Sequence, residues 1–294
     1  MTLGRIVEVT FTLIRRHARV LIPLYAVVDL PLYVLTTIAS DAFVADLTRA
    51  VGPGGLAEPA AISAEEAAIL LPGFLQVMAT TLLLGVVSAI GAGAIAIAVR
   101  EALEDRPPRF LAALGGAVRR SVALIGSSLI ALAATVALLA VGFGMLVLLG
   151  IASGGPALTP GGGVTTFLAL IVAIAIAVGI VALQVRWTFQ FAAATLDGQG
   201  AVSTLRRSWR VTRGSAWRVF GVTLLFVFMT FVLGSLVVEL GTAIAAGPVS
   251  GDAAVAGGIS LVAGAIASSV IGVVVPVALT VMYLDLRSRS ADPA

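Results

Sequence analysis

Six long apolar stretches constrain the fold of this chain more than any other feature of its sequence. They lie at roughly 20–40, 69–99, 121–151, 164–185, 217–246 and 253–284, and charged connectors separate them. A helix needs about 20 mostly apolar residues to cross the hydrocarbon core of a bilayer. Only 11% of the 294 residues are charged, whereas soluble domains average about 25%. We therefore expect an all-α, polytopic membrane protein with six transmembrane helices.

Prolines interrupt the first and sixth stretches, and Pro23, Pro31 and Pro276 are expected kink sites. The first stretch could alternatively belong to a cleaved signal peptide. Its apolar part is long for such a peptide, and no small-x-small cleavage site follows it before Asp41. We expect it to remain in the protein as a membrane anchor.

The arginines alternate between connectors and thereby predict the topology. All 18 basic residues are arginines. Every one except Arg49 lies before the first stretch, between the second and third, between the fourth and fifth, or at the end of the sixth. The positive-inside rule places such connectors in the cytoplasm. We expect a multi-pass protein of the bacterial cytoplasmic membrane with both termini in the cytoplasm.

The basic segments also suggest an internal repeat. Each contains an arginine pair and precedes two apolar stretches, and the three read TLIRRHARV, GAVRRSVAL and STLRRSWRV. We expect one integral membrane domain over 1–290, with three repeats of an interfacial amphipathic helix and a transmembrane hairpin (about 1–100, 101–186 and 187–290). A short tail, 291–294, follows. The alternative is that any protein that obeys the positive-inside rule carries arginines before its spans.

The first two basic segments are amphipathic in a helical projection, so we expect their apolar faces to lie in acyl chains and their arginines at phosphates. The apolar face of the first segment comprises Leu3, Ile6, Val7, Phe11, Leu13 and Ile14, and the polar face comprises Arg5, Glu8, Thr12, Arg15, Arg16 and Arg19. In the second segment, Phe110, Leu111, Leu114 and Val118 oppose Arg109, Arg119 and Arg120.

The third basic segment departs from this pattern. Val202, Leu205 and Trp209 form a narrow apolar stripe with arginines beside it rather than opposite. One interpretation is topological anchoring with an aromatic belt. The other is a contact site for anionic lipid headgroups or a partner protein, because clustered arginines next to a membrane attract acidic headgroups. The residues that would form this site are Arg206, Arg207, Trp209, Arg210, Arg213 and Trp217.

Two carboxylates fall inside the apolar stretches. Asp29 lies near mid-depth of the first, and Glu239 lies near the external end of the fifth. A charged side chain at the centre of a span costs about 2.5–3.5 kcal/mol and often marks a transport path. A small-solute or ion transporter or channel that uses both residues is therefore the alternative function, and a structural role for Asp29 is the competing interpretation.

Small residues recur every four positions in the sixth stretch, which predicts close helix packing against another span or a second subunit. They are Ala256, Ser260, Gly264, Ser268 and Gly272.

Catalytic residue patterns are missing from the sequence. The only histidine is His17, there is no cysteine, and the carboxylates of the first external loop have no metal-loop spacing. We expect no enzyme activity, cofactor, metal site or nucleic-acid partner. Phosphodiester chemistry on lipids is a further alternative, which would require a carboxylate cluster with bound metal at the cytoplasmic interface.

The C-terminal third carries several short motifs in a fixed order. Arg-Trp at 186–187 is followed by Asp-Gly at 197–198, Arg-Ser-Trp at 207–209, Thr-Arg-Gly at 212–214 and Tyr-x-Asp-Leu-Arg at 283–287. This pattern resembles the bacterial glycerophosphoryl diester phosphodiesterase membrane-domain family, with Asp197 where that family is expected to have Glu. The resemblance implies a free-standing membrane module that lacks the separate catalytic domain.

Asp285 and Arg287 near the end of the chain form an expected polar lock. Both lie on the same membrane face as the third basic segment, so we expect Asp285 to bond Arg207 or Arg213. The function that these features favour is a non-catalytic accessory or scaffolding module. Its arginine face would contact anionic headgroups or a partner protein.

Overall fold

The computed structural model describes residues 2–51, 64–153, 164–198, 200–245 and 253–291. The glycine-rich stretches at 52–55 and 160–163, and the expected tail beyond Ala291, lie outside the described residues.

Every regular element in these ranges is a helix, and six helical segments are long and apolar enough to cross a membrane. This confirms the all-α fold with six candidate spans. The long helices are α1 (Leu3–Val51), α2 (Ala64–Leu103), α4 (Ser121–Ser153), α5 (Val164–Trp187), α8 (Ala216–Ala245) and α9 (Ala253–Ile271), which α10 (Val274–Ala291) continues. Three shorter helices connect them: α3 (Phe110–Arg119), α6 (Gln190–Asp197) and α7 (Ala201–Thr212).

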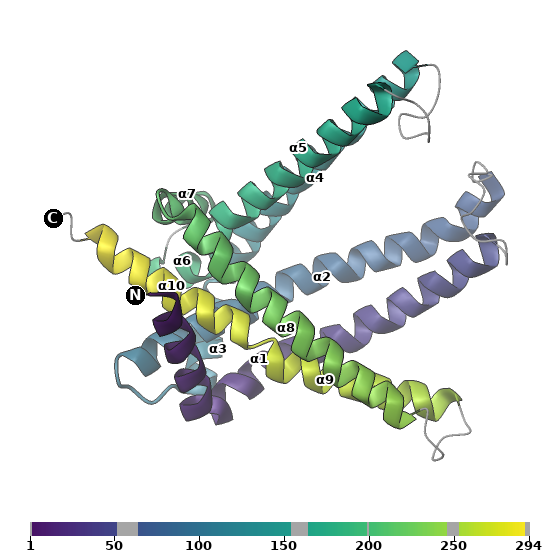
Figure 1. The fold of residues 1–294 in the computed structure, drawn as a ribbon. Coiled ribbons are helices and arrows are strands. Elements are labelled where there is room, and N and C mark those ends of the chain that lie inside the picture. Colours follow the sequence, from purple (N-terminus) through teal and green to yellow (C-terminus); the bar gives the residue numbers. More distant parts are fainter. Residues whose placement is uncertain (1, 52–63, 154–163, 199, 246–252, 292–294) are drawn as a thin grey trace.

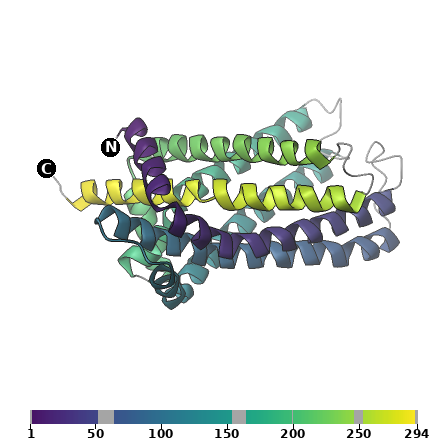
Figure 2. The same ribbon diagram turned by 90° about the horizontal axis from the view of Figure 1, so that it is seen from below.

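The long helices form three hairpins, α1/α2, α4/α5 and α8/α9, which meet at one end of the molecule and splay apart toward the other (Figure 1). We call the meeting end the base. It contains α3, α6, α7, α10 and both chain termini (Figure 1). Seen from below, the long helices run away from the base in a common direction (Figure 2).

A backbone break separates each basic helix from the long helix that follows it. The first break is at His17 inside α1, where φ is −120° and ψ is 24°. The second is at Arg120 between α3 and α4, and the third is around Gly214, whose φ is +84°. Pro23 and Pro31 lie within α1 at positions where the backbone stays helical.

Pro276 behaves differently from the other two prolines. The sixth span is interrupted at Gly272–Val273, between α9 and α10. Proline has no N–H, so it cannot bond the carbonyl four residues earlier, and that carbonyl belongs to Gly272. The kink expected from Pro276 is confirmed at this position.

The first two basic helices place only part of their expected apolar faces on protein. Ile6 and Leu13 are buried in clusters with α2 and α10, whereas Leu3 and Phe11 of the same face are exposed. In α3 the buried residues are Ala113 and Ala117, while Leu111 and Val118 of the expected apolar face are exposed, as contact with acyl chains requires. The buried parts arise because α2 and α10 extend into the base beneath the first helix, and α2 also packs on α3.

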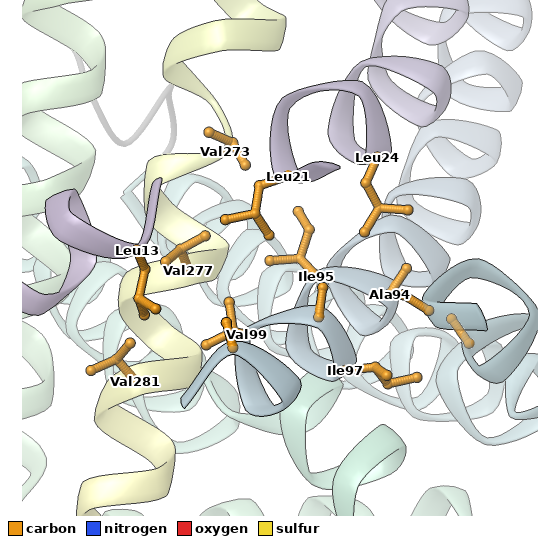
Figure 3. Close-up of a cluster of buried hydrophobic side chains, with 14 of the residues drawn as sticks. Leu13, Leu21, Leu24, Ala94, Ile95, Ile97, Val99, Val273, Val277 and Val281 are labelled. Carbon is orange, nitrogen blue, oxygen red and sulfur yellow. The ribbon is translucent and has the colours of Figure 1, made fainter. Parts of the chain in front are cut away.

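The core at the base joins the first hairpin to the last. Leu13, Leu21 and Leu24 of α1 meet side chains of α2 and α10 (Figure 3). The partners from those helices include Ala94, Ile95, Ile97, Val99, Val277 and Val281. This packing fixes the end of the molecule at which the arginines gather.

Candidate functional site

Asp197 lies at the centre of a polar cluster in the base. It is the last residue of α6, and its side chain is only 6% exposed. Tyr283 donates its hydroxyl to Oδ2 at 2.6 Å, and Arg207 donates Nε to the same oxygen at 3.2 Å. Arg287 Nη1 forms an ion pair with Oδ1 at 2.9 Å. One carboxylate thus connects α6, α7 and α10.

Asp285 forms a second ion pair in the same region. Arg218 Nη2, at the start of α8, lies 3.4 Å from Oδ2, and Arg289 Nη2 lies 3.3 Å from the same atom. The expected partner Arg207 pairs instead with Asp197, because α7 follows α6 through a short turn. The polar lock at Asp285 is present, but its partner outside α10 is Arg218, so the expectation of Arg207 or Arg213 is corrected.

The turn after Asp197 depends on Gly198. Its φ is +68°, a left-handed conformation that glycine adopts without strain. A Cβ at this position would lie 2.5 Å from Arg120 Nη1. That guanidinium donates to the carbonyl of Ala194 at 3.3 Å and so caps the C-terminal end of α6.

The inner face of α7 packs through hydroxyl groups as well as apolar side chains. Ser208 Oγ donates to the carbonyl of Arg186 at 2.8 Å, and Thr212 Oγ1 lies 3.5 Å from the same oxygen. This carbonyl is in the last turn of α5, where helix carbonyls lack intrahelical donors. The buried residues of α7 are Thr204, Leu205, Ser208, Val211 and Thr212.

The opposite face of α7 points outward. The expected apolar stripe is divided, because Leu205 is buried while Val202 and Trp209 are exposed. The inner face of α7 is completed by Ser208 and Thr212, whose hydroxyl groups are satisfied by hydrogen bonds to backbone carbonyls. The exposed residues on the outer face include Arg206, Trp209, Arg210 and Arg213, and Trp217 follows on α8.

The expected contact residues therefore divide into two groups. Arg207 is mostly buried against Asp197, which makes it a structural residue. Arg206, Arg210 and Arg213 lie on the exposed face with Trp209. The guanidinium carbon of Arg186 lies 4.9 Å from the centroid of the Trp209 ring, a cation–π contact that orients the indole.

Asp29 packs against α9 rather than against another charge. Ser268 donates its hydroxyl to Asp29 Oδ2, and the Tyr25 hydroxyl neighbours the same carboxylate. A Cβ at Gly264 would lie 1.9 Å from the Tyr33 hydroxyl, and one at Gly272 would lie 2.7 Å from that of Tyr25. The small-residue stripe of the sixth span thus receives α1 of the same chain. Asp29 lies in this interface between α1 and α9, as its structural interpretation requires.

Glu239 lies elsewhere. It is exposed on α8, close to the end of that helix farthest from the base. The contacts of Asp29 are with α1 and α9, so the structure does not bring the two expected intramembrane carboxylates together.

Sequence reasoning missed the structural roles of three arginines of the base. Arg120, Arg186 and Arg218 each lie within one or two residues of a helix boundary. In the sequence, Arg120 belonged to a polar face, Arg186 to a short motif and Arg218 to a basic connector, and none of the three had an assigned contact. A positive residue at a helix end beside an unsatisfied carbonyl is the signal that could have singled out Arg120.

Comparison with known proteins places the chain in a family. The model of a family described as Domain of unknown function (DUF7847) matches residues 1–286. The chain belongs to the DUF7847 family. No curated protein and no solved structure matches it. The DUF7847 match covers all three hairpins and both buried carboxylates of the base. It provides no link to the glycerophosphoryl diester phosphodiesterase membrane family, and that resemblance rests on the sequence motifs.

Proposed function

We propose that this DUF7847 protein is a non-catalytic accessory or scaffolding module of the bacterial cytoplasmic membrane, with its base on the cytoplasmic side. The exposed face of α7 binds anionic lipid headgroups. The two faces of α7 carry this proposal. One face is fixed to α5 through its hydroxyl groups, while Arg206, Arg210 and Trp209 are exposed on the other. Arginines and tryptophans at headgroup depth are typical of lipid contact.

The lipid contact is tested by native mass spectrometry of the detergent-purified protein. The variant Arg206→Ala/Arg210→Ala/Arg213→Ala removes the exposed arginines and leaves Arg207 on Asp197. We expect it to lose most of the acidic phospholipid that the wild type retains. At about 1 kcal/mol for each arginine near the surface, the loss of affinity should be at least tenfold.

The matched control removes three other exposed arginines of the base. Arg5→Ala/Arg106→Ala/Arg119→Ala changes the net charge by the same amount. We expect this variant to lose much less lipid than the α7 variant, because its three arginines lie on separate segments and do not form one cluster. Equal retention by all three proteins would reject the α7 site and direct attention to a protein partner at this face.

We further propose that the chain is a threefold repeat related to the glycerophosphoryl diester phosphodiesterase membrane domains. The three hairpins support this idea, because a basic helix precedes each one and a backbone break separates that helix from the hairpin. So does a carboxylate near the base end of each hairpin, namely Glu101, Asp197 and Asp285. Glu101 Oε2 accepts from the backbone N–H of Arg109 at 3.4 Å, just before α3.

A transporter or channel that uses Asp29 and Glu239 is a second candidate, supported by one cavity near the first of these residues. The cavity has a volume of about 290 Å³ and includes Tyr25, the neighbour of Asp29. Four other hydroxyl residues contribute to its wall: Ser88, Thr188, Thr230 and Thr280. Reconstituted vesicles with an internal pH-sensitive dye test it. A proton flux of the wild type that disappears in Asp29→Asn would favour transport, and no flux above empty vesicles would reject a proton-coupled path.

A further inference from the structure

A lateral groove separates the second hairpin from the third at the base. It has a volume of about 460 Å³ and lies between one face of α5 and the start of α8. Arg186 is the only charged residue in its wall. The apolar residues are Ala177, Val178, Val181, Ala182 and Val185 of α5 and Ala216, Trp217 and Phe220 of α8.

The groove opens toward the surroundings of the hairpins. Val178 and Val181 are exposed, and Trp217 is 86% exposed beside Phe220, with ring centroids 6.0 Å apart. Beyond the groove, α5 and α8 diverge (Figure 1). In a membrane, an apolar groove of this kind faces acyl chains rather than water.

Arg186 supplies a charge at the base end of the groove. Its Nη1 atom is buried and has no hydrogen-bond partner, and no carboxylate within the described part of the chain pairs with this guanidinium. The nearby acidic side chains of the base, Asp197 and Asp285, are already paired with other arginines. The guanidinium is half-buried and stacks on Trp209, so an anion is needed only for its unsatisfied N–H groups, and their burial without a partner is costly.

The dimensions of the groove match one membrane leaflet. Its α5 wall runs from Ala177 to Arg186, which is about 13 Å at 1.5 Å per residue. One leaflet is half of a hydrocarbon core that is about 30 Å thick, so the length of the groove is similar to the thickness of one leaflet. Trp217 marks headgroup depth at the same end as Arg186, in the position that tryptophan prefers at a membrane interface.

We propose that this groove holds one anionic phospholipid, with an acyl chain along α5 and its phosphate at Arg186. This site deepens the proposed function, on which it rests for the position of the base at the headgroups. It differs from the face of α7 in enclosing an acyl chain rather than only contacting headgroups.

Native mass spectrometry with added dioleoyl phosphatidylglycerol or dioleoyl phosphatidylcholine tests the site. We expect the wild type to retain one phosphatidylglycerol at a collision energy that strips other lipids. Val181→Trp fills the groove from an exposed position, and Arg186→Gln removes the charge. Either change should lower the retained fraction about fivefold or more, the effect of one arginine–headgroup interaction.

Leu170→Trp is the matched control, because Leu170 is exposed on the same helix and lies outside the groove. It should retain the lipid. Unchanged retention in Val181→Trp, or equal retention of phosphatidylcholine by the wild type, would overturn the proposal. If Arg186→Gln fails to fold, Val181→Trp still decides the question.

The experiments can reject either lipid proposal without rejecting the other. The triple arginine variant of α7 leaves the groove intact, so it should keep the tightly held phosphatidylglycerol while losing the weaker lipids. Loss of the tight lipid only in the groove variants, with no effect of the α7 variant, would reject the headgroup face and support the groove. The reverse result would reject the groove alone.

Discussion

The guanidinium of Arg120 occupies the space that a side chain would need at Gly198. These residues are far apart in sequence, yet a Cβ on Gly198 would lie 2.5 Å from Arg120 Nη1. The same Arg120 atom donates to the Ala194 carbonyl in the last turn of α6. The start of the second hairpin is thereby tied to its end, directly beside the carboxylate of Asp197.

Gly198→Ala is expected to destabilise the protein. A left-handed φ costs a residue with a Cβ about 1–2 kcal/mol, and the methyl group would also displace Arg120. Thermal unfolding in detergent should show a midpoint lower by several degrees. Gly115→Ala is the control, because Gly115 has a helical backbone inside α3 and no atom lies within 4 Å of its Cβ. Equal midpoints for both variants would contradict this account of the turn.

Asp197→Asn should weaken the base by leaving Arg207 and Arg287 without their counter-charge. The two arginine side chains are 27% and 40% exposed. Water therefore offsets part of the loss, and we expect about 1–3 kcal/mol rather than the full cost of breaking a buried pair. The midpoint of thermal unfolding measures this change.

Asp46→Asn provides the comparison for Asp197. It makes the same chemical change in a pair with Arg49, whose side chain is largely exposed, far from the base. Exposed pairs contribute about 0–1 kcal/mol. A loss at Asp46 as large as the loss at Asp197 would show that the base cluster has no special structural role.

Gly264→Leu should disrupt the packing of α1 on α9. The Tyr33 hydroxyl lies 1.9 Å from where the Cβ would be, so the two helices must separate or Tyr33 must move. We expect a lower unfolding midpoint and proteolysis of α1 at lower temperature. Gly257→Leu, on an exposed position of the same helix with no atom within 4 Å of its Cβ, should unfold like the wild type.

A charge exchange tests the link between Arg218 and Asp285. Arg218→Asp and Asp285→Arg should each lower the unfolding midpoint, because each places like charges about 3.4 Å apart in the wild-type geometry. The double exchange should recover part of the loss. Additive losses would show that the two side chains do not interact directly, since only coupled residues depart from additivity.

The sequence determined the number of spans, the helical class and the end of the molecule at which arginines gather. Long apolar stretches and charged connectors are local properties, and a bilayer converts them directly into crossings. The regular spacing from Gly264 to Gly272 likewise indicated a packing face on the sixth span.

Only the tertiary structure decided which partners those features meet. Asp285 is paired with Arg218 and Arg207 with Asp197, because α6 turns back into the base before α7 begins. The small-residue face of α9 receives Tyr33 of α1 at Gly264. Several arginines were equally plausible partners in sequence. Which arginine pairs with which carboxylate depends on the direction that each helix takes after its break. Packing between distant segments sets that direction, so no single segment encodes it.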